Sequence, residues 1–428
     1  MKSVIITPSS LKGTINIPSS KSLCHRSIIA AGLSNGVSNI DNIIYSDDIN
    51  ATIDGMRAFG VIINKTENGL SIDGSKSILF NDEINDQDEY YIDCIESGST
   101  LRFFIPISAL TDKKVTFSGR GRLGERPLDP YYDIFNKQQL KYYNNEGKLP
   151  LTVEGRLSPG LFYISGDVSS QFITGLLYAL PCLNGDSSII LTTQLESKPY
   201  VDMTIDTLKK FSVSVTNNGY KDFFIKGNQS YKPYDCKVEG DFSQAAFWLA
   251  AGALGGNIEL NDINMDSLQG DKVIVDLLSK MGANIMIKMK SVLIKESVLN
   301  GITIDASECP DLVPILAVIG ALSKGTTEII NAARLRLKES DRLKAIAVEL
   351  NKLGADVKEK EDGLLIKGKE KLNGGTVNSW NDHRIAMALA VASIKCTDTV
   401  IIEDSEAVKK SYPEFFEDFK KLGGIITN

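Results

Sequence analysis

The sequence predicts an α/β protein of two lobes, built from six copies of one supersecondary unit. Six segments, each opening an apolar helix, carry the repeat: SSKSLCHRS (19–27), ESGSTLRFF (96–104), VSSQFITGL (168–176), DFSQAAFWL (241–249), ECPDLVPIL (308–316) and NDHRIAMAL (381–389). Equivalent positions are 77, 72, 73, 68 and 72 residues apart, taking as anchors Lys21, Gly98, Ser170, Ser243, Asp311 and His383. Periodicity of this length indicates a repeated structural unit whose irregular ends are available for function.

Each repeat is expected to contain a helix, a strand, a second helix and two further strands. The first helix, for example SQAAFWLAAGALG, is apolar nearly all round and should therefore be buried. A strand-like run follows it in every copy: VSNIDNI, KKVTFSG, SSIILTT, GNIELND, TTEIINA and DTVIIED. The second helix, for example ESDRLKAIAVELNKLG, is amphipathic and should lie outside, and the last strands alternate as in GLLIKG.

The division into lobes follows from length and from the repeat. A chain of 428 residues is long for one hydrophobic core, and three repeats around shared buried helices would make one lobe. The N-terminal segment MKSVIITPSSLKGTINIPSS also resembles strands and precedes the first repeat. We therefore expect residues 1–20 and 238–428 to form lobe 1, and residues 21–237 to form lobe 2.

Composition narrows the class of protein. With 47 Lys and Arg against 54 Asp and Glu, the net charge of −7 argues against a nucleic-acid or membrane-surface binder. No apolar run reaches the ~18 residues of a membrane span. The apolar stretch near the N-terminus is too short for a secretory signal. Six cysteines without a CxxC pair suit a reducing cytoplasm, and two histidines exclude a histidine-rich metal site.

Cations stand near the expected helix starts in most repeats: Lys21, Arg26, Arg102, Arg126, Lys198, Lys338, Arg342, Arg384 and Lys410. A cation at a helix N-terminus is unfavourable by ~0.3–1 kcal/mol, so its repeated use needs a compensating partner. Helix N-termini combined with cations form a receptor for several anions. The alternative is a set of solvated cations paired with Asp48, Glu339, Asp341 and Asp382.

Neutral donors and two carboxylates accompany these cations. Ser169, Ser170 and Gln171 open the third helix, where helix capping is the simpler interpretation. Asp311 opens an otherwise apolar helix and could be either a cap or a functional carboxylate. Glu339 lies within LKESDRL, where it could belong to a surface ion-pair lattice. A carboxylate among cations stays ionised and can act as a base or, transiently, as an acid.

The segments SSKSLCHRS, SGSTLR, GERPL, SSQF, SKPY, PDLVP, KESDRL, NDHR and KKSYPEFF together resemble the 5-enolpyruvylshikimate-3-phosphate synthases over essentially the whole chain. The resemblance implies the two-lobed enolpyruvyl transferase fold, with three βαβαββ-type units per lobe. It also implies transfer of the enolpyruvyl group of phosphoenolpyruvate to the 5-hydroxyl of shikimate 3-phosphate, with release of phosphate. No metal or organic cofactor is required, and we expect a cytoplasmic monomer whose partners are these two anionic substrates.

The same resemblance implies roles for individual residues. Asp311, Glu339 and Lys21 would be catalytic, Asp311 as the proton acceptor and Glu339 as the proton donor and acceptor at the methylene carbon. Shikimate 3-phosphate would be bound by Lys21, Ser22, Arg26, Ser169, Ser170, Gln171, Ser197, Tyr200, Asp311 and Lys338. Phosphoenolpyruvate would be bound by Lys21, Gly98, Arg126, Gln171, Arg342, Arg384 and Lys410.

The sequence departs from the family pattern at two positions, and it leaves three competing functions to be weighed. Glu96 stands where many members have Asn, and Arg334 where some place Asn on the shikimate ligand; both bear on fine contacts and on sensitivity to glyphosate.

The sister enolpyruvyl transferase acting on UDP-N-acetylglucosamine carries a catalytic cysteine in a loop that corresponds here to the cysteine-free GRGRLGERPLDPYYDIF. A sixfold repeat is also compatible with a DNA-encircling clamp, and an anion receptor with a non-catalytic binding protein for phosphate esters.

Overall fold

The structure is a computed structural model that describes residues 2–79 and 87–427. The chain forms two compact lobes: lobe 1 comprises 1–20 and 239–428, and lobe 2 comprises 21–238. The sequence places the second boundary between 237 and 238, one residue earlier. Each lobe has its own hydrophobic core.

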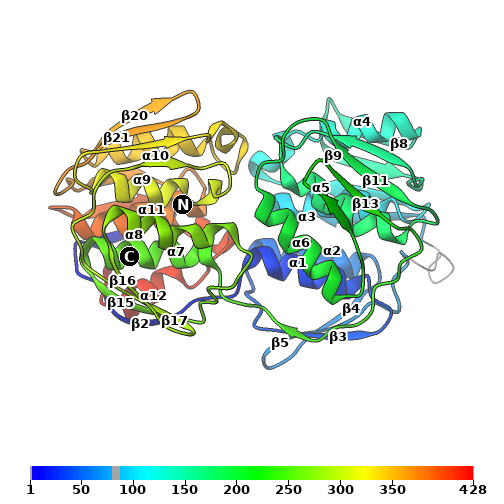
Figure 1. The fold of residues 1–428 in the computed structure, drawn as a ribbon, viewed down its shortest axis with the longest axis horizontal. Coiled ribbons are helices and arrows are strands. Elements are labelled where there is room, and N and C mark those ends of the chain that lie inside the picture. The colour runs from blue at the N-terminus through cyan, green and yellow to red at the C-terminus, as the bar shows by residue number, and fades with distance from the viewer. Residues whose placement is uncertain (1, 80–86, 428) are drawn as a thin grey trace. The chain divides into compact units, whose positions relative to one another are not determined.

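The α/β architecture of six repeats predicted from the sequence is confirmed (Figure 1). Across the described residues, the apolar first helices are α1 (Lys21–Gly32), α3 (Gly98–Ser108), α5 (Ser170–Ala179), α7 (Phe242–Gly255), α9 (Val313–Ala321) and α11 (His383–Ala392). The second helices are α2 (Asp47–Ala58), α4 (Asp129–Gln138), α6 (Lys198–Lys210), α8 (Val273–Met281), α10 (Arg342–Lys352) and α12 (Phe415–Lys421). Every residue of α7, α9 and α11 is buried, as their apolar composition requires.

Each repeat contributes a four-stranded sheet within the described part of the chain. The strand after the buried helix is β3 (Val37–Asp41), β7 (Lys114–Ser118), β11 (Ser187–Leu191), β15 (Asn257–Asn261), β19 (Thr326–Ile330) or β23 (Val400–Glu403). On one side it pairs in parallel with a first strand: β14 (Cys236–Lys237), β6 (Glu89–Asp93), β10 (Leu161–Ile164), β2 (Lys12–Asn16), β18 (Thr303–Asp305) or β22 (Gly375–Asn378). On its other side an antiparallel strand pairs with it.

The antiparallel strands come mostly from a hairpin that ends the repeat. These hairpins are β4–β5 (Ile62–Lys65, Gly69–Asp73), β8–β9 (Lys141–Asn145, Lys148–Glu154), β12–β13 (Thr216–Asn218, Asp222–Ile225), β16–β17 (Asn284–Ile287, Ser291–Lys295) and β20–β21 (Asp356–Lys360, Gly363–Lys367). In the sixth repeat, β24 (Ile425–Thr427) and β1 (Val4–Thr7) take these places. The two chain ends therefore share one sheet.

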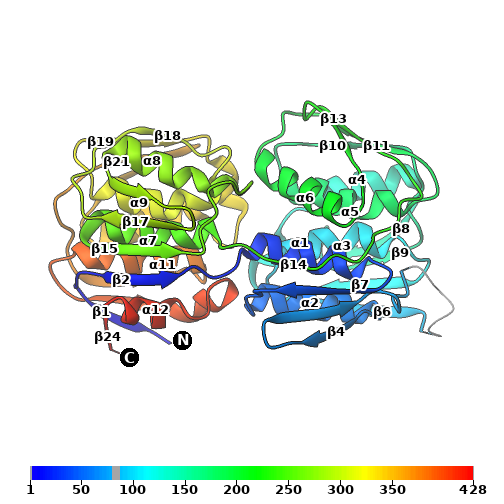
Figure 2. The ribbon, with the colours of Figure 1, turned by 60° about the horizontal axis from the view of Figure 1, so that its bottom comes forward.

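Three strands complete repeats that are distant in the chain. In lobe 1, β1 completes the sixth repeat and β2 completes the fourth. In lobe 2, β14 follows the third repeat but pairs with β3 of the first. Figure 2 shows β2 beside β15, and β14 near α1. These three pairings therefore form only when the distant ends of a lobe's chain segments are brought together.

Three of the expected cations lie shortly before a second helix and not at its first residue. Arg126 follows the 3₁₀ helix η2 (Gly121–Glu125), Lys338 follows η6 (Ala333–Leu337), and Lys410 ends η8 (Ser405–Lys410). None of these residues begins a helix. Each lies instead on the connection between a repeat's middle strand and its second helix, and such 3₁₀ turns have no distinct periodicity in the sequence.

Three buried helices pack together inside each lobe. In lobe 1, α9 contacts both α7 and α11, and in lobe 2, α3 packs closely along α5 (Figure 1). Trp248 of α7 is wholly buried and stacks on Phe415 of α12, with 4.9 Å between the ring centroids. Among the described residues, no helix is long and apolar enough to cross a membrane.

Candidate active site

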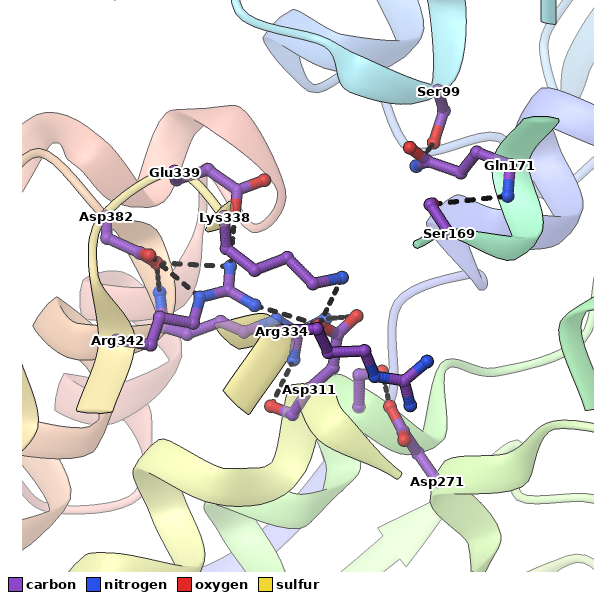
Figure 3. Close-up of polar contacts among 12 residues, drawn as sticks. Ser99, Ser169, Gln171, Asp271, Asp311, Arg334, Lys338, Glu339, Arg342 and Asp382 are labelled. Atoms are coloured by element: carbon purple, nitrogen blue, oxygen red, sulfur yellow. Dashed lines mark hydrogen bonds and ion pairs between the residues drawn. The ribbon is translucent and has the colours of Figure 1, made fainter. Parts of the chain in front are cut away.

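Arg342 is the centre of a charge cluster in lobe 1 (Figure 3). It is the first residue of α10, and its side chain is only 1% exposed. Its Nε lies 2.8 Å from Asp382 Oδ2, its Nη1 2.8 Å from Asp311 Oδ1, and its Nη2 2.6 Å from Glu339 Oε2. Burial alone would lower the pKa of Arg342, but Asp382, Glu339 and Asp311 together raise it, so the guanidinium stays charged.

Asp311 also forms ion pairs with two further cations. Arg384 Nη2 lies 3.1 Å from Asp311 Oδ2, and Lys338 Nζ lies 3.6 Å from Oδ1. Asp311 sits in the short 3₁₀ helix η5 (Pro310–Leu312), and its side chain caps neither that helix nor α9. The capping interpretation of Asp311 is therefore wrong, because its carboxylate is directed to side chains of three other segments.

The charge state of Asp311 follows from this balance. Burial by itself would raise the pKa of Asp311, but Arg384, Lys338 and Arg342 hold it well below its usual range. Conversely, burial lowers the pKa of Lys338 while Asp311 opposes that shift. Asp311 is thus a carboxylate whose basicity depends on how strongly its cationic neighbours are neutralised.

A second buried carboxyl, Asp271, lies beside this cluster on η4 (Gly270–Lys272). Ser243 Oγ, near the start of α7, donates to Asp271 Oδ2, whereas Oδ1 is buried with no hydrogen-bond partner. Burial raises the pKa of Asp271 to about 7, with the negative charge of Asp311 adding to the effect and Arg384 opposing it. Sequence reasoning missed Asp271 because it lies 40 residues from Asp311, in a segment without a charge pattern of its own.

The segment before α11 contacts three of the expected site cations of lobe 1: Arg342, Arg384 and Lys410. Asp382 caps α11 by accepting from Arg384 N (2.9 Å), and Ser340 Oγ donates to its Oδ2 (3.0 Å). Lys410 Nζ donates to Asn381 O at 2.6 Å. Asp382 thus joins the starts of two helices, since it binds both the first residue of α10 and the first turn of α11.

In lobe 2, Lys21 begins α1 and forms a buried ion pair. Its Nζ lies 2.7 Å from Asp48 Oδ2, and the two side chains are 15% and 10% exposed. The sequence alternative of solvated cations paired with four carboxylates is right about Asp48, Glu339 and Asp382, which pair with Lys21 or Arg342, but these pairs are little exposed. Ion pairs with so little exposure are screened much less by salt than surface pairs. The fourth carboxylate, Asp341, pairs instead with Arg336.

Arg26, on the same helix, connects α1 to α6. Its Nε donates to Thr204 Oγ1 (3.0 Å), its Nη1 to Ser22 O (2.8 Å) and its Nη2 to Tyr200 O (2.8 Å). These bonds use three of its five N–H donors. Next to Tyr200, Ser197 lies at the start of α6 in the left-handed region, with φ of 56°. Such a backbone is uncommon for serine and is often found at functional sites.

The starts of α3 and α5 bring a further group together (Figure 3). Gln171 Oε1 accepts from Arg102 Nη1 (2.7 Å), and Gln171 Nε2 donates to Ser99 Oγ (3.0 Å). Ser169 caps α5 by accepting from Gln171 N (3.3 Å), as the capping interpretation predicts, while Ser170 begins the helix and is buried.

Gly98 allows a cation to approach the start of α3. A Cβ at this position would stand 2.7 Å from Arg126 Nη1, so the absence of a side chain admits the guanidinium. Arg126 is buried, with 8% exposure. The backbone N–H groups at the start of α3 and a buried guanidinium are thus adjacent, which is an arrangement suited to an anion.

The two departures from the family pattern occupy distinct places. A Cβ on Gly121 would stand 2.9 Å from Glu96 Oε2, so the Glu96 carboxylate lies against the η2 turn that precedes Arg126. Arg334 Nη2 donates to Ser307 O in lobe 1. Both residues flank elements that carry expected site residues.

The chemical character of these groups narrows what the site can do. Within 2–79 and 87–427, no set of three or more His, Cys, Asp and Glu side chains is arranged to hold a metal ion. The polar groups described in each lobe are mainly cations, serines and a few carboxylates, which is a set suited to binding anions and transferring protons. Together with the fold, these groups indicate a protein that acts on small anions.

Comparison with known proteins identifies the family. The family model described as EPSP synthase (3-phosphoshikimate 1-carboxyvinyltransferase) matches residues 5–419. A 3-phosphoshikimate 1-carboxyvinyltransferase of Clostridium novyi (strain NT) is 61% identical over 428 residues, covering 100% of this chain and 98% of the relative. The protein of the same name from Clostridium acetobutylicum is 58% identical over 427 residues, with the same coverage. A solved EPSP synthase from Acinetobacter baumannii covers both chains fully with a TM-score of 0.82 and 25% identity.

The chain belongs to the EPSP synthase family. It is a transferase, and its place is the enolpyruvyl transfer of the shikimate pathway that leads to aromatic amino acids. The alternative activity on UDP-N-acetylglucosamine is not favoured, because both clostridial relatives carry the 3-phosphoshikimate name.

Proposed function

We propose that this chain transfers the enolpyruvyl group of phosphoenolpyruvate to the 5-hydroxyl of shikimate 3-phosphate, with Asp311, Glu339 and Lys21 transferring the protons. The observation that carries the residue assignment is the buried guanidinium of Arg342, which holds Asp311 at 2.8 Å and Glu339 at 2.6 Å. Two carboxylates on one cation supply two separate proton-transferring groups within a single cluster.

The anionic groups of the substrates account for the cations. Phosphoenolpyruvate and shikimate 3-phosphate each carry a carboxylate and a phosphate, so the two molecules repel one another unless cations surround them. Arginine grips such groups in a bidentate manner. We assign phosphoenolpyruvate to Lys21, Gly98, Arg126, Gln171, Arg342, Arg384 and Lys410, and shikimate 3-phosphate to Lys21, Ser22, Arg26, Ser169, Ser170, Gln171, Ser197, Tyr200, Asp311 and Lys338.

The chemistry has two steps. In the first, Glu339 in its protonated form gives its proton to the methylene carbon of phosphoenolpyruvate. The 5-hydroxyl loses its proton to Asp311, and its oxygen bonds to the adjacent carbon. In the second, the tetrahedral adduct returns a methyl proton to Glu339 and its carbon–oxygen bond to phosphate breaks. Asp311 gives its proton to the departing phosphate, so both carboxyl groups regain their starting states. Holding both substrates aligned contributes several kcal/mol, within a general upper range of ~7–11.

Substrate binding also adjusts the base. In the free protein, cations hold the pKa of Asp311 well below its usual range, which makes it a weak proton acceptor. An anionic substrate on Arg342 and Arg384 neutralises part of that positive charge, so the pKa of Asp311 rises when a proton must be accepted. The base is thus strengthened by the ligand that it serves.

The decisive experiment is a coupled assay for phosphate release from phosphoenolpyruvate, with and without shikimate 3-phosphate. We expect release only when both substrates are present. Binding of both without any release would favour a non-catalytic binding protein for phosphate esters. Release with UDP-N-acetylglucosamine in place of shikimate 3-phosphate would assign the sister activity.

We further propose a cytoplasmic monomer. The cysteines at 24, 94, 182, 236, 309 and 396 are all free thiols, four of them buried, as in proteins of a reducing compartment. Each lobe buries its own apolar helices without a partner chain. Light scattering at micromolar concentration should give a mass near 46.7 kDa, whereas twice that value would show a dimer.

A further inference from the structure

Glu349 is a buried carboxylate that takes no part in the proposed chemistry. Its side chain is 1% exposed, on the helix α10 that begins with Arg342. It accepts from Trp380 Nε1 at 2.7 Å and from Asn378 N at 3.0 Å, and it pairs with Lys352 Nζ at 2.8 Å. Glu349 and Arg342 are seven residues apart, about two helical turns, so they lie on the same face of α10.

Arg342 and Glu349, both on α10, therefore bind the segment 378–382. Arg342 binds it through the side chain of Asp382, at 2.8 Å, and Glu349 binds it through Asn378 and Trp380. The two attachment points lie at opposite ends of the segment. The helix thus defines both the position and the conformation of the chain between them.

The segment between these points has an uncommon backbone. Trp380 and Asn381 have φ of 56° and 52°, two consecutive residues in the left-handed region. This conformation is rare for a bulky residue such as Trp, and it persists only where surrounding contacts enforce it. Asn378 Oδ1 accepts from Trp380 N at 2.6 Å, and Ser379 Oγ accepts from Asn381 N at 3.2 Å.

This turn supports three residues of the proposed phosphoenolpyruvate set. Asn381 O receives Lys410 Nζ at 2.6 Å, and that carbonyl belongs to the left-handed turn itself. The next residue, Asp382, binds Arg342 and caps the first turn of α11, which carries Arg384. A change in the turn would therefore displace Lys410 directly, and Arg342 and Arg384 through Asp382.

We propose that Glu349 and Trp380 are positioning residues for phosphoenolpyruvate: their hydrogen bond maintains the left-handed turn whose Asn381 carbonyl and Asp382 carboxylate place Lys410, Arg342 and Arg384. The inference rests on the proposed function, because it assumes that these three cations bind phosphoenolpyruvate. The contrasting interpretation is that Glu349 only fastens α10 to a neighbouring segment and contributes to stability alone.

Two variants test this inference. Glu349→Gln removes the carboxylate and places an N–H where an acceptor is needed, and Trp380→Phe removes the indole donor while keeping an aromatic ring. We expect each to raise the KM for phosphoenolpyruvate about tenfold, since one hydrogen bond to a charged group is lost. The dissociation constant for shikimate 3-phosphate should stay within twofold. If Glu349→Gln does not fold, Trp380→Phe decides alone.

Matched controls separate positioning from stability. Asn351→Ala removes the bonds of α10 to Val357 (2.8 and 2.9 Å), two residues after Glu349 and away from the turn. Lys352→Met removes the ion pair but leaves the Trp380 bond. Both should lower the unfolding midpoint and leave the KM for phosphoenolpyruvate within twofold. The double variant Glu349→Gln/Trp380→Phe should raise the KM by less than the product of the two single effects, because both substitutions weaken the same group of hydrogen bonds.

The outcomes are distinguishable. An active wild type whose Glu349 and Trp380 variants keep the KM for phosphoenolpyruvate within twofold would overturn the inference and leave the proposed function intact. Equal losses of affinity for both substrates would also overturn it, since a general weakening of the fold predicts that result. If the wild-type protein releases no phosphate in response to shikimate 3-phosphate, the proposed function is wrong, and this inference is wrong with it.

Discussion

Arg342 shows how one side chain sets the charge of its neighbours. It is buried, and it donates to Asp311, Glu339 and Asp382 at 2.6–2.8 Å. Removing one partner of such a cluster leaves buried charge without compensation, which costs more than the pair itself contributes. Substitutions that keep shape and hydrogen bonding are therefore the informative ones at this site.

Asp311→Asn and Glu339→Gln each remove one proton-transferring group and keep the size of the side chain. We expect turnover to fall by roughly 10²–10⁴, the usual contribution of one positioned acid or base. Shikimate 3-phosphate should still bind, because the cations and serines assigned to it remain. Steady-state kinetics and calorimetric titration measure the two effects. Near-normal turnover of Glu339→Gln would transfer the donor role to Lys21, and an affinity loss alone in Asp311→Asn would make Asp311 a ligand anchor.

Asp271 should give the protein a pH-dependent stability. Burial, with the charge of Asp311, raises its pKa from 3.8 to about 7. Between these values the folded chain holds a proton that the unfolded chain has released. The stabilisation is therefore complete below the unfolded pKa and is lost as the pH rises through about 7.

His25 gives a pH dependence of stability with the opposite sign. Burial, with the charges of Lys21 and Arg26, lowers the pKa of His25, so its contribution to stability is lost as the pH falls below 6.5.

The variant Asp271→Asn isolates this contribution, because His25 is unchanged in it. As the pH rises from 5 to 8, the unfolding free energy of the variant should increase relative to that of the wild type, because only the wild type loses the contribution of Asp271. Urea unfolding at intervals of one pH unit measures the difference. A difference that is constant over this range would show that Asp271 titrates with an ordinary pKa in the folded protein.

At the scale of elements, helix starts combine capping with function. Asp382 caps α11 and binds Arg342, while Asp341 caps α10 by accepting from Lys344 N at 3.1 Å. The sequence treats capping and function as alternatives at such positions. The structure shows that Asp382 both caps a helix and binds Arg342, because its two oxygens accept from different donors.

The contact between α3 and α5 depends on Gly175. A Cβ there would stand 2.4 Å from Arg102 O and 2.4 Å from Tyr131 Oη, so the helices could not approach as they do. Gly175→Ala should lower the unfolding free energy by about 1–3 kcal/mol through overpacking. It should also weaken phosphoenolpyruvate binding, because Arg102 and Gln171 join these helices at 2.7 Å.

Urea unfolding of Gly175→Ala, compared with Gly124→Ala, measures this prediction. The nearest atom to a Cβ at Gly124 is 4.0 Å away, so that change should alter stability by no more than about 0.5 kcal/mol. Equal effects of the two substitutions would show that α3 and α5 separate without cost.

At the scale of the whole molecule, the residues that we propose to bind each substrate come from both lobes. Shikimate 3-phosphate is assigned to Ser170 and Tyr200 of lobe 2, and to Asp311 and Lys338 of lobe 1. Under this proposal one ligand would contact both lobes, and its binding would favour conformations in which both sets of contacts are made. We expect small-angle scattering to give a smaller radius of gyration with shikimate 3-phosphate than without it. An unchanged radius at saturation, from a demonstrably open free form, would count against this assignment.

Local pattern was enough to predict the repeat. Apolar helices, the strands after them and the amphipathic second helices are each encoded within short stretches, and 381–389 or 241–249 can be recognised without knowledge of their neighbours. The resemblance added roles for residues such as Asp311 and Lys410, which remain proposals. It could not indicate how those residues contact one another, because the partners of a side chain depend on segments far away in the chain.

The sequence by itself determined the α/β class, the sixfold repeat and the family, because periodicity and motif order are properties of the linear chain. The tertiary structure decided which strands complete which repeat, since β1, β2 and β14 pair with strands that are distant in sequence. It also decided that Arg342 is buried among three carboxylates, that Asp271 lies beside Asp311, and that Glu349 holds the turn at Trp380. These features arise from packing between distant segments, where burial and charge are set jointly by residues that no local pattern connects.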